Sequence, residues 1–472
     1  MTAQQRWLLG LASLGSFMVI LDVLVVTTAL TTIQHDLKAS ITSLEWIVNA
    51  YSLTFAVLLL TGSALGDRFG RRRIFVVGLG IFTLMSVACA LSPNIGTLIA
   101  ARAVQGCGAA LVMPLALTQI SVAFPPASRG RALGIFSGVT GLATFVGPVV
   151  GGAVAQGLAW QWIFWLNVPI GVVAIVLVLA RIGETHGPRA PLDIVGALLV
   201  TGGVLGLVWG LVRGNVVGWL SPEVLGTLVL GVLFGVAFVI WEAHAPTPML
   251  PMKFFRIRAF WSANAANFAL YGSVYGILFL LAQFLQNAQG LGPLAAGLRL
   301  LPWTATLMVF APIAGNLVDR LGERWFMVFG LLLQAAGLAW LALVARPTTA
   351  YLLLLLPMLV TGVGASMAMP AAQKEVIGAV APQDVGKAAG AVTMLRILGG
   401  VFGIAIATAV FAGSGNFASR QGFTDGFVPA ISVASAIAVI GVFLALAMPG
   451  RRTSRGPAEA MPPAPTPVAT RN

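Results

Sequence analysis

The chain has 472 residues, of which 58% are hydrophobic and only 9% are charged, and its mean hydropathy is +0.95. Soluble domains typically carry about 25% charged residues, so this composition excludes a water-soluble globular protein and indicates a polytopic membrane protein. The formal net charge of +13 raises the question of nucleic-acid binding. The basic residues lie in short clusters between apolar runs, however, as the positive-inside rule describes for membrane proteins. We therefore expect no nucleic-acid partner.

Fourteen apolar runs are long enough to cross a hydrocarbon layer of roughly 30 Å as helices, which takes about 20 residues each. They cover residues 7–30, 45–65, 74–92, 96–118, 131–155, 160–181, 192–212, 223–241, 259–286, 294–318, 325–345, 350–371, 387–412 and 428–448. An even number of spans places both termini on the same side. The predicted fold class is an all-α polytopic membrane protein with 14 transmembrane helices.

The first predicted span contains Asp22 in the otherwise apolar stretch FMVILDVLVVTTAL (17–30). An isolated carboxylate in hydrocarbon is costly, so its presence calls for a partner, a proton or a function. At 1.5 Å per residue, Asp22 lies roughly 22 Å from the inner end of its span. We interpret Asp22 as a protonation site, and the alternative is a buried hydrogen-bond partner that holds helices together.

The loop after the second span, GSALGDRFGRRR (62–73), combines glycines with clustered charges. The glycines permit a tight turn, and the acidic residue beside the arginines can form a charge network at a helix end. We interpret this segment as a cytoplasmic gate loop that opens and closes with the transport cycle; the alternative is a plain basic anchor. The residues assigned to the gate loop are Gly62, Gly66, Asp67, Arg68, Gly70, Arg71 and Arg72.

Arg102 lies within the fourth predicted span, in RAVQGCGAA (102–110), roughly 9 Å from the outer side. In a core of about 30 Å, this depth nearly matches that of Asp22. Burial favours the neutral form of a carboxyl group and a nearby arginine favours the charged form, so the balance can shift as a cavity opens and closes. A substrate that enters from the cytoplasmic side can then compete with the proton. We predict that Asp22 and Arg102 couple proton binding to transport; a clamp on backbone carbonyl groups is the alternative for Arg102, and both roles can coexist.

The fifth predicted span carries TFVGPVVGG (144–152), in which small residues at 143, 147 and 151 form one helical stripe. Such a stripe lets helix backbones approach closely, and an embedded proline removes a backbone hydrogen bond and can bend the helix. We predict a hinge or seal between two halves of the molecule, and ordinary helix packing is the alternative. The residues assigned to it are Gly147, Pro148, Gly151 and Gly152.

Two motifs recur eight spans later and in the same order. GDRFGRRR (66–73) returns as VDRLGERW (318–325), and QGCGAALVMP (105–114) returns as TGVGASMAMP (361–370). The simplest account is two six-helix halves with two extra helices inserted between them, and such parallel repeats build transporters whose substrate site lies between the halves. The predicted organisation is an N-terminal half over 1–181, a linker with two helices and cytoplasmic loops over 182–258, a C-terminal half over 259–448 and a disordered cytoplasmic tail over 449–472.

Most of the 27 Lys and Arg residues lie on alternate loops and at both chain ends. The positive-inside rule therefore places both termini in the cytoplasm. Arg396, near the middle of the thirteenth span, is one of the few basic residues inside a span, and we interpret its role as mostly structural.

The motifs at 62–73, 102–110 and 144–152 resemble those that follow the second span and lie in the fourth and fifth spans of the major facilitator superfamily. LDVLVVTTAL (21–30) and LRILGGVFGIA (395–405) are similar to segments of its 14-helix drug:proton antiporters. The resemblance implies a proton-driven exporter of lipophilic compounds in the bacterial cytoplasmic membrane. It also implies that the first and fourth spans meet at a central cavity, and that the acidic residue of the gate loop holds the outward-facing state.

We predict efflux of lipophilic drugs, antibiotics or related toxic compounds by proton antiport and alternating access. Export of an endogenous metabolite is the alternative, and uniport or import is a further one that the antiporter-type fifth span disfavours. ATP-driven export is excluded because the sequence has no Gly-x-x-x-x-Gly-Lys-Ser/Thr loop. We expect no enzymatic activity, metal or cofactor, because His, Cys and acidic residues do not cluster at a common depth. The expected partners are a small lipophilic or singly charged substrate, protons and lipid, with the chain acting as a monomer.

Aromatic and amide side chains in the spans expected to line the cavity are candidate substrate contacts. They are Tyr51, Phe55, Phe136, Asn267, Tyr271, Tyr275 and Gln283. Each of these positions can alternatively face lipid or be packed between helices.

Overall fold

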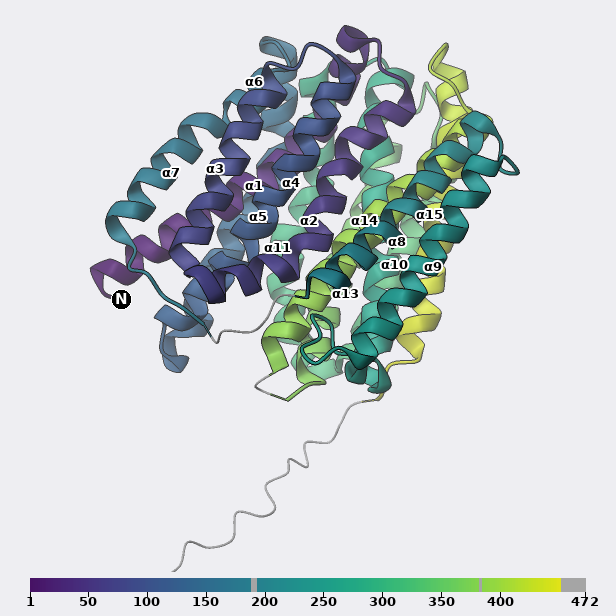
Figure 1. The fold of residues 1–472 in the computed structure, drawn as a ribbon. Coiled ribbons are helices and arrows are strands. Elements are labelled where there is room, and N and C mark those ends of the chain that lie inside the picture. Colours follow the sequence, from purple (N-terminus) through teal and green to yellow (C-terminus); the bar gives the residue numbers. More distant parts are fainter. Residues whose placement is uncertain (188–192, 382–383, 451–472) are drawn as a thin grey trace, which may run out of the picture.

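Long helices run side by side along the whole chain, as Figure 1 shows for the computed structural model of the protein. The structure describes residues 1–187, 193–381 and 384–450; within α5 and α11 the side chains of 126–127, 129–130, 311–312, 314–317 and 319–321 are outside this description. The predicted tail over 449–472 therefore falls almost entirely outside the described residues. We call the end of the bundle where α1 begins and α15 ends the terminal end, and the opposite end the distal end.

In the described residues up to His244 the chain forms nine α-helices. They are α1 (Ala3–Leu37), α2 (Ile41–Phe69), α3 (Arg71–Ala90), α4 (Ile95–Ala123), α5 (Pro126–Gly157), α6 (Trp162–Trp165), α7 (Asn167–Arg181), α8 (Ile194–Val217) and α9 (Pro222–His244). The second part contains η1 (Met252–Arg256), α10 (Arg258–Gln283), the π-helical η2 (Phe284–Ala288), α11 (Pro293–Leu321), α12 (Glu323–Val344), α13 (Tyr351–Gly378), α14 (Val385–Ser414) and α15 (Arg420–Leu446).

The predicted fold class is confirmed: among the described residues, 14 helical segments are long and apolar enough to cross a membrane. Most helices extend past the predicted apolar runs, because backbone hydrogen bonding continues where hydropathy falls. In α1, for example, the Thr2 side chain accepts from the Gln5 backbone N–H while the Gln5 side chain accepts from the Thr2 N–H. This capping box starts the helix at Ala3, before the predicted span begins.

The two repeats found in the sequence make equivalent helix contacts. A Cβ on Gly106 of α4 would collide with Thr54 and the Tyr51 carbonyl of α2, and a Cβ on Gly362 of α13 would collide with Thr306 and the Trp303 carbonyl of α11. In each case the glycine admits a threonine hydroxyl and a backbone carbonyl of the neighbouring helix. The repeated glycines thus serve the same purpose, which is close helix packing.

The next glycine of each repeat packs against the third helix of its own half. Gly108 of α4 lies against the Gly78 carbonyl of α3, and Gly364 of α13 lies against the Gly330 carbonyl of α12. The set α2, α3 and α4 therefore has the same packing as the set α11, α12 and α13. The equal packing of the two helix sets accounts for the recurrence of the glycine motif in the sequence.

Both copies of the loop motif turn on a glycine in the left-handed region. Gly70, after α2, has φ of +107°, and Gly322, after α11, has φ of +89°. Residues with a Cβ are strained in this conformation. The turn therefore requires glycine at the same place in both copies.

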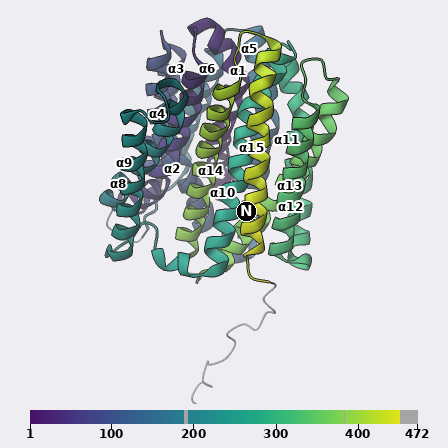
Figure 2. The ribbon, with the colours of Figure 1, turned by 90° about the vertical axis from the view of Figure 1, so that its right-hand side faces the viewer.

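The helices α8 and α9 form a hairpin outside the two repeats. They pack against each other, and α8 also contacts α2 and α14, so the hairpin covers the junction of these two helices (Figures 1 and 2). Trp46 of α2 and Trp209 of α8 have ring centroids 5.6 Å apart. At the base of the hairpin, the Trp241 indole N–H donates to Asp193 Oδ1 at 2.7 Å.

Candidate functional site

A buried ion pair links α1 and α4. The guanidinium of Arg102 donates to the carboxylate of Asp22, and the side chain of each residue is only 1% exposed. The structure thus brings together the two residues that the sequence analysis placed at a common depth. Each charge offsets the cost of burying the other, and removal of either would leave an uncompensated charge in a low-dielectric interior.

Two amide side chains complete the surroundings of the Asp22 carboxylate. Asn167 of α7 donates to Asp22 Oδ1 at 2.8 Å, and Gln105 of α4 donates to the same oxygen at 3.2 Å. Arg102 occupies Oδ2. Both carboxylate oxygens therefore accept hydrogen bonds, as a buried charge requires.

Three further groups hold the Arg102 guanidinium. Its NH1 group donates to Gln105 Oε1 at 2.7 Å, and Nε–H donates to the Ile47 carbonyl of α2 at 3.2 Å. The guanidinium carbon lies 4.2 Å from the ring centroid of Tyr51, within the range of a cation–π contact. Arg102 therefore combines the ion pair with a clamp on a backbone carbonyl.

The sequence analysis did not assign Gln105, Asn167 or Ser86 to this site. Gln105 also donates to the Ser86 hydroxyl of α3 at 2.8 Å, so α3 and α7 join the network through small polar groups. All three residues are buried within apolar spans. An uncharged polar residue in such a position is the signal that could have identified them.

A second buried carboxylate belongs to Glu45 of α2, which the sequence analysis also left unassigned. Asn49 donates to Glu45 Oε1 at 3.1 Å. No Lys or Arg among the described residues forms an ion pair with it. Its position near the start of α2 gave no reason to expect burial.

Most of the predicted substrate contacts are buried in this structure. Tyr51, Phe55, Phe136, Asn267 and Gln283 are all buried, whereas Tyr271 and Tyr275 on α10 are partly exposed. Tyr51 and Phe55 pack edge to face beside the ion pair, with ring centroids 6.1 Å apart. Phe136 lies in a hydrophobic core cluster of the first part of the chain.

The helix α5 packs against α1 with one row of glycines. A Cβ on Gly147 would lie 2.6 Å from Leu24 Cβ, and one on Gly151 would collide with the Thr28 hydroxyl and Val25. This is the stripe of small residues that the sequence analysis described. It joins α5 to the helix that carries Asp22.

A neighbouring row on α5 faces α11, in the second part of the chain. A Cβ on Gly152 would collide with the Pro293 carbonyl, and one on Gly297 of α11 would collide with the Pro148 carbonyl. Nearby, the Leu294 N–H donates to Gln156 Oε1 at 3.1 Å. The predicted hinge or seal therefore lies against α1 on one side and α11 on the other.

The π-helical turn η2 makes a second seam at the distal end. It brings Gln286 to α1, where its Oε1 accepts from the Thr31 hydroxyl and its Nε2 donates to the Thr28 carbonyl at 3.1 Å. Single π turns of this kind often occur at functional sites. We call the α5–α11 and α1–η2 contacts together the distal seams.

A polar cavity of about 810 Å³ opens beside the distal seams. Its lining includes Thr31, Asp36, Trp160, Gln161 and Gln286. The Trp160 indole N–H donates to Asp36 Oδ2 at 2.6 Å, which ties the α5–α6 connection to α1.

The gate loop makes its ion pairs within the first part of the chain. Asp67 pairs with Arg71 at 2.8 Å and lies beside Gly187, while the Glu184 carboxylate accepts from the Arg72 N–H at 2.9 Å. Arg68 lies over the ring of Phe69. The glycines of the loop have a packing role, because Gly62 and Gly66 lie against Ala110 and Leu115 of α4.

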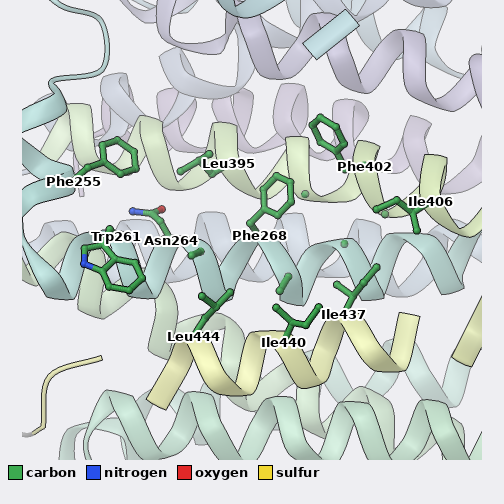
Figure 3. Close-up of a pocket in the computed structure, with 15 residues that line it drawn as sticks. Phe255, Trp261, Asn264, Phe268, Leu395, Phe402, Ile406, Ile437, Ile440 and Leu444 are labelled. Atoms are coloured by element: carbon green, nitrogen blue, oxygen red, sulfur yellow. The ribbon is translucent and has the colours of Figure 1, made fainter. Parts of the chain in front are cut away.

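An apolar groove of about 490 Å³ lies between α10, α14 and α15 (Figure 3). Phe268 of α10, Leu395 and Phe402 of α14 and Ile440 of α15 are among its lining residues. None of the predicted substrate contacts lines it. Two of the helices that line the groove also carry other residues of interest, since Tyr271 and Tyr275 lie on α10 and Arg396 follows Leu395 on α14.

Comparison with protein families gives a match over nearly the whole chain. The model described as Major Facilitator Superfamily matches residues 12–263 and again 263–471. The chain belongs to the major facilitator superfamily. The predicted resemblance is thereby confirmed, and the protein is a multi-pass membrane protein of a transporter family.

Several relatives of this superfamily member are named as antibiotic-resistance proteins. It is 38% identical to the tetracenomycin C resistance and export protein of Streptomyces glaucescens over 69% of this chain, a match that spans 61% of that protein. It is 32% identical to the methylenomycin A resistance protein of Streptomyces coelicolor over 93% of this chain and 92% of that protein.

The fold also matches solved transporter structures. A bacterial homologue of the human lysosomal transporter Spinster superposes with a TM-score of 0.68 over 95% of this chain and 98% of that chain. The two sequences are only 16% identical, so this likeness supports the fold alone.

Proposed function

We propose that this transporter exports small lipophilic compounds, antibiotics among them, across the bacterial cytoplasmic membrane in exchange for protons. The names of the relatives, which describe antibiotic resistance and export, support the efflux direction. The protein works as a monomer, drives transport from the proton gradient without a cofactor, and performs no covalent chemistry.

The observation that carries the proton coupling is the buried pair of Asp22 and Arg102. A titratable carboxylate within a span is a functional-site candidate, because its burial costs free energy and such residues are usually kept for a function. Protonation of Asp22 would remove the charge that Arg102 balances. Arg102 would keep the Gln105 side chain and the Ile47 carbonyl as hydrogen-bond acceptors, but its buried charge would lose its counter-charge, which favours a rearrangement of α1 against α4.

The helix α1 connects this pair to the distal seams. Asp22 lies roughly 14 Å along the helix from Thr31, and between them Val25 and Thr28 lie against Gly151 of α5. A shift of α1 relative to α4 on protonation would therefore reach both seams. We propose that this is how proton binding opens the distal side.

The distal end faces the outside in this proposal, with both termini in the cytoplasm. Residues 1–181 and 259–448 act as the two halves that rock against each other, and 182–258 links them. In this structure the distal seams are closed and Asp67 is paired within the N-terminal half. These contacts support a state that is closed toward the outside.

A growth-inhibition panel in a pump-deficient bacterial host tests the proposal. Cells that express the chain should tolerate several lipophilic antibiotics better than cells that express Asp22→Asn at the same protein level. Equal tolerance of all compounds in both strains and in the empty host would contradict drug efflux.

A further inference from the structure

The middle of α14 carries an arginine without an acidic partner. Arg396 lies roughly 17 Å along the helix from its first residue, Val385, and it is partly exposed despite this depth. No Asp or Glu of the described residues pairs with it. The titratable groups that act on it are Tyr271 and Tyr275.

Two tyrosines of α10 surround this guanidinium. Its central carbon lies 5.5 Å from the Tyr271 ring centroid, and the rings of Tyr271 and Tyr275 are 6.1 Å apart. Gly400 lets the Tyr275 ring pack closely against α14, since a Cβ there would lie 3.0 Å from the ring. The guanidinium and both rings thus form one partly exposed cluster where α10 and α14 pack together.

The cluster approaches the Asp22–Arg102 pair. The helix α14, which carries Arg396, packs against α2, and the ring of Tyr51 on α2 lies against Arg102. The cluster and the ion pair therefore lie on neighbouring helices. The negative charge of Asp22 is already balanced by Arg102, so Arg396 is the unbalanced positive charge among these residues.

A purely structural role does not explain why most N–H donors of the Arg396 guanidinium lack an acceptor in the part of the chain that the structure describes. An arginine has five N–H donors in a rigid fork, and the contact that Arg396 makes among the described residues is with the ring face of Tyr271. An arginine that clamps helices would be expected to reach carbonyl groups, as Arg102 does at Ile47. The unused donors and the partial exposure leave the guanidinium accessible to a ligand.

We infer that Arg396 sets the charge preference of the substrate site. The site takes flat aromatic compounds whose polar groups are hydrogen-bond acceptors without positive charge, such as carbonyl, enol, phenolate or carboxylate oxygens. The guanidinium fork binds such oxygens well, and the tyrosine rings offer faces and edges to an aromatic body. Lipophilic cations are excluded, because they would meet an unbalanced charge at low dielectric. This inference rests on the proposed export function, of which it specifies the substrate class.

Equilibrium binding of three matched probes tests it. The purified full-length protein in nanodiscs of phosphatidylcholine is titrated at pH 7.5 with anthracene-9-carboxylate, 9-anthracenemethanol and 9-(aminomethyl)anthracene, with empty nanodiscs as the blank. The probes share one ring system and differ in charge. The wild type should bind the carboxylate and the alcohol and should bind the ammonium compound at least about tenfold more weakly.

Two substitutions and a control then assign the preference. Arg396→Gln should weaken carboxylate binding about tenfold or more, leave the alcohol within about twofold and admit the ammonium compound. Arg396→Lys should keep the wild-type order, because the charge remains. Arg299→Gln is the matched control, since Arg299 stacks on Tyr351 at 4.9 Å and lies away from the cluster.

Each result decides the question. The inference is overturned if the wild type binds the ammonium compound as tightly as the carboxylate or the alcohol, or more tightly. This result needs no variant to fold. Equal weakening of all three probes in Arg396→Gln, without rescue by lysine, shows a structural arginine and overturns it too. Because binding at equilibrium needs no proton gradient, the proposed export can fail in transport assays while this charge order still holds.

Discussion

The guanidinium of Arg102 donates to the carboxylate of Asp22, and neither side chain exposes more than 1% of its surface. The pair joins α1 to α4, and Gln105 and Asn167 satisfy the remaining acceptor sites on the carboxylate. Since each buried charge depends on the other, replacing one of the two residues should cost more stability than replacing both.

Arg102→Gln should destabilise the protein by about 3–5 kcal/mol, because it leaves the Asp22 carboxylate buried without its counter-charge. Adding Asp22→Asn to this variant should recover much of the loss, since the double variant buries no charge. Thermal melting in detergent measures both. A single Arg102→Gln variant that melts at the wild-type temperature would show that the pair contributes nothing to stability.

Asp67→Asn should slow transport while protein level and substrate affinity stay close to wild type. The substitution removes the ion pair with Arg71 at 2.8 Å, and a contact that differs between states changes their populations rather than the binding site. Asp425→Asn is a suitable control, because Asp425 is a surface acid at the distal end that accepts from Gln421. Wild-type turnover in Asp67→Asn would reduce the gate loop to an anchor.

Gly152→Ala should impair transport far more than Gly157→Ala. The first Cβ would collide with the Pro293 carbonyl across the α5–α11 seam, whereas the second enters open space on the same helix. The folded fraction measured by size-exclusion chromatography should be similar for both, because the collision can be relieved by opening the seam. Equal transport by the two variants would mean that closure of this seam is not needed.

Reporter fusions test the proposed orientation. A fusion after Gly450 and one after Gly187 should report the cytoplasm, and one within 415–419, between α14 and α15, should report the outside. Signals from the same side at Gly187 and at 415–419 would show that the span count or the orientation is wrong.

The helical segments and the helix packing within each repeat could be predicted because they depend on local chemistry. Long apolar runs must be helical in a membrane, and the recurring glycines of QGCGAALVMP and TGVGASMAMP mark close helix approaches that Gly106 and Gly362 make. The meeting of Asp22 and Arg102 could be anticipated from their depths, since buried charges need partners.

The rest of the site could not be read from the sequence, because nearly uniform hydropathy does not show which face of a helix points inward. Five of the seven predicted substrate contacts are buried, Phe136 among them. Asn167 reaches Asp22 only because α7 returns beside α1. Arg396 was interpreted as structural, since its lack of an acidic partner becomes visible only in three dimensions.

The most direct test of the account is pH-driven uptake by inverted membrane vesicles that carry Asp22→Asn. Asparagine keeps the size and much of the hydrogen bonding of aspartate but cannot exchange a proton, and one pH unit supplies about 1.4 kcal/mol per proton only to a coupled transporter. The account predicts that the variant folds, exchanges substrate down its own gradient in counterflow, and fails to accumulate it against one. Undiminished uptake driven by the pH gradient in Asp22→Asn vesicles would contradict the assignment of Asp22 as the proton site.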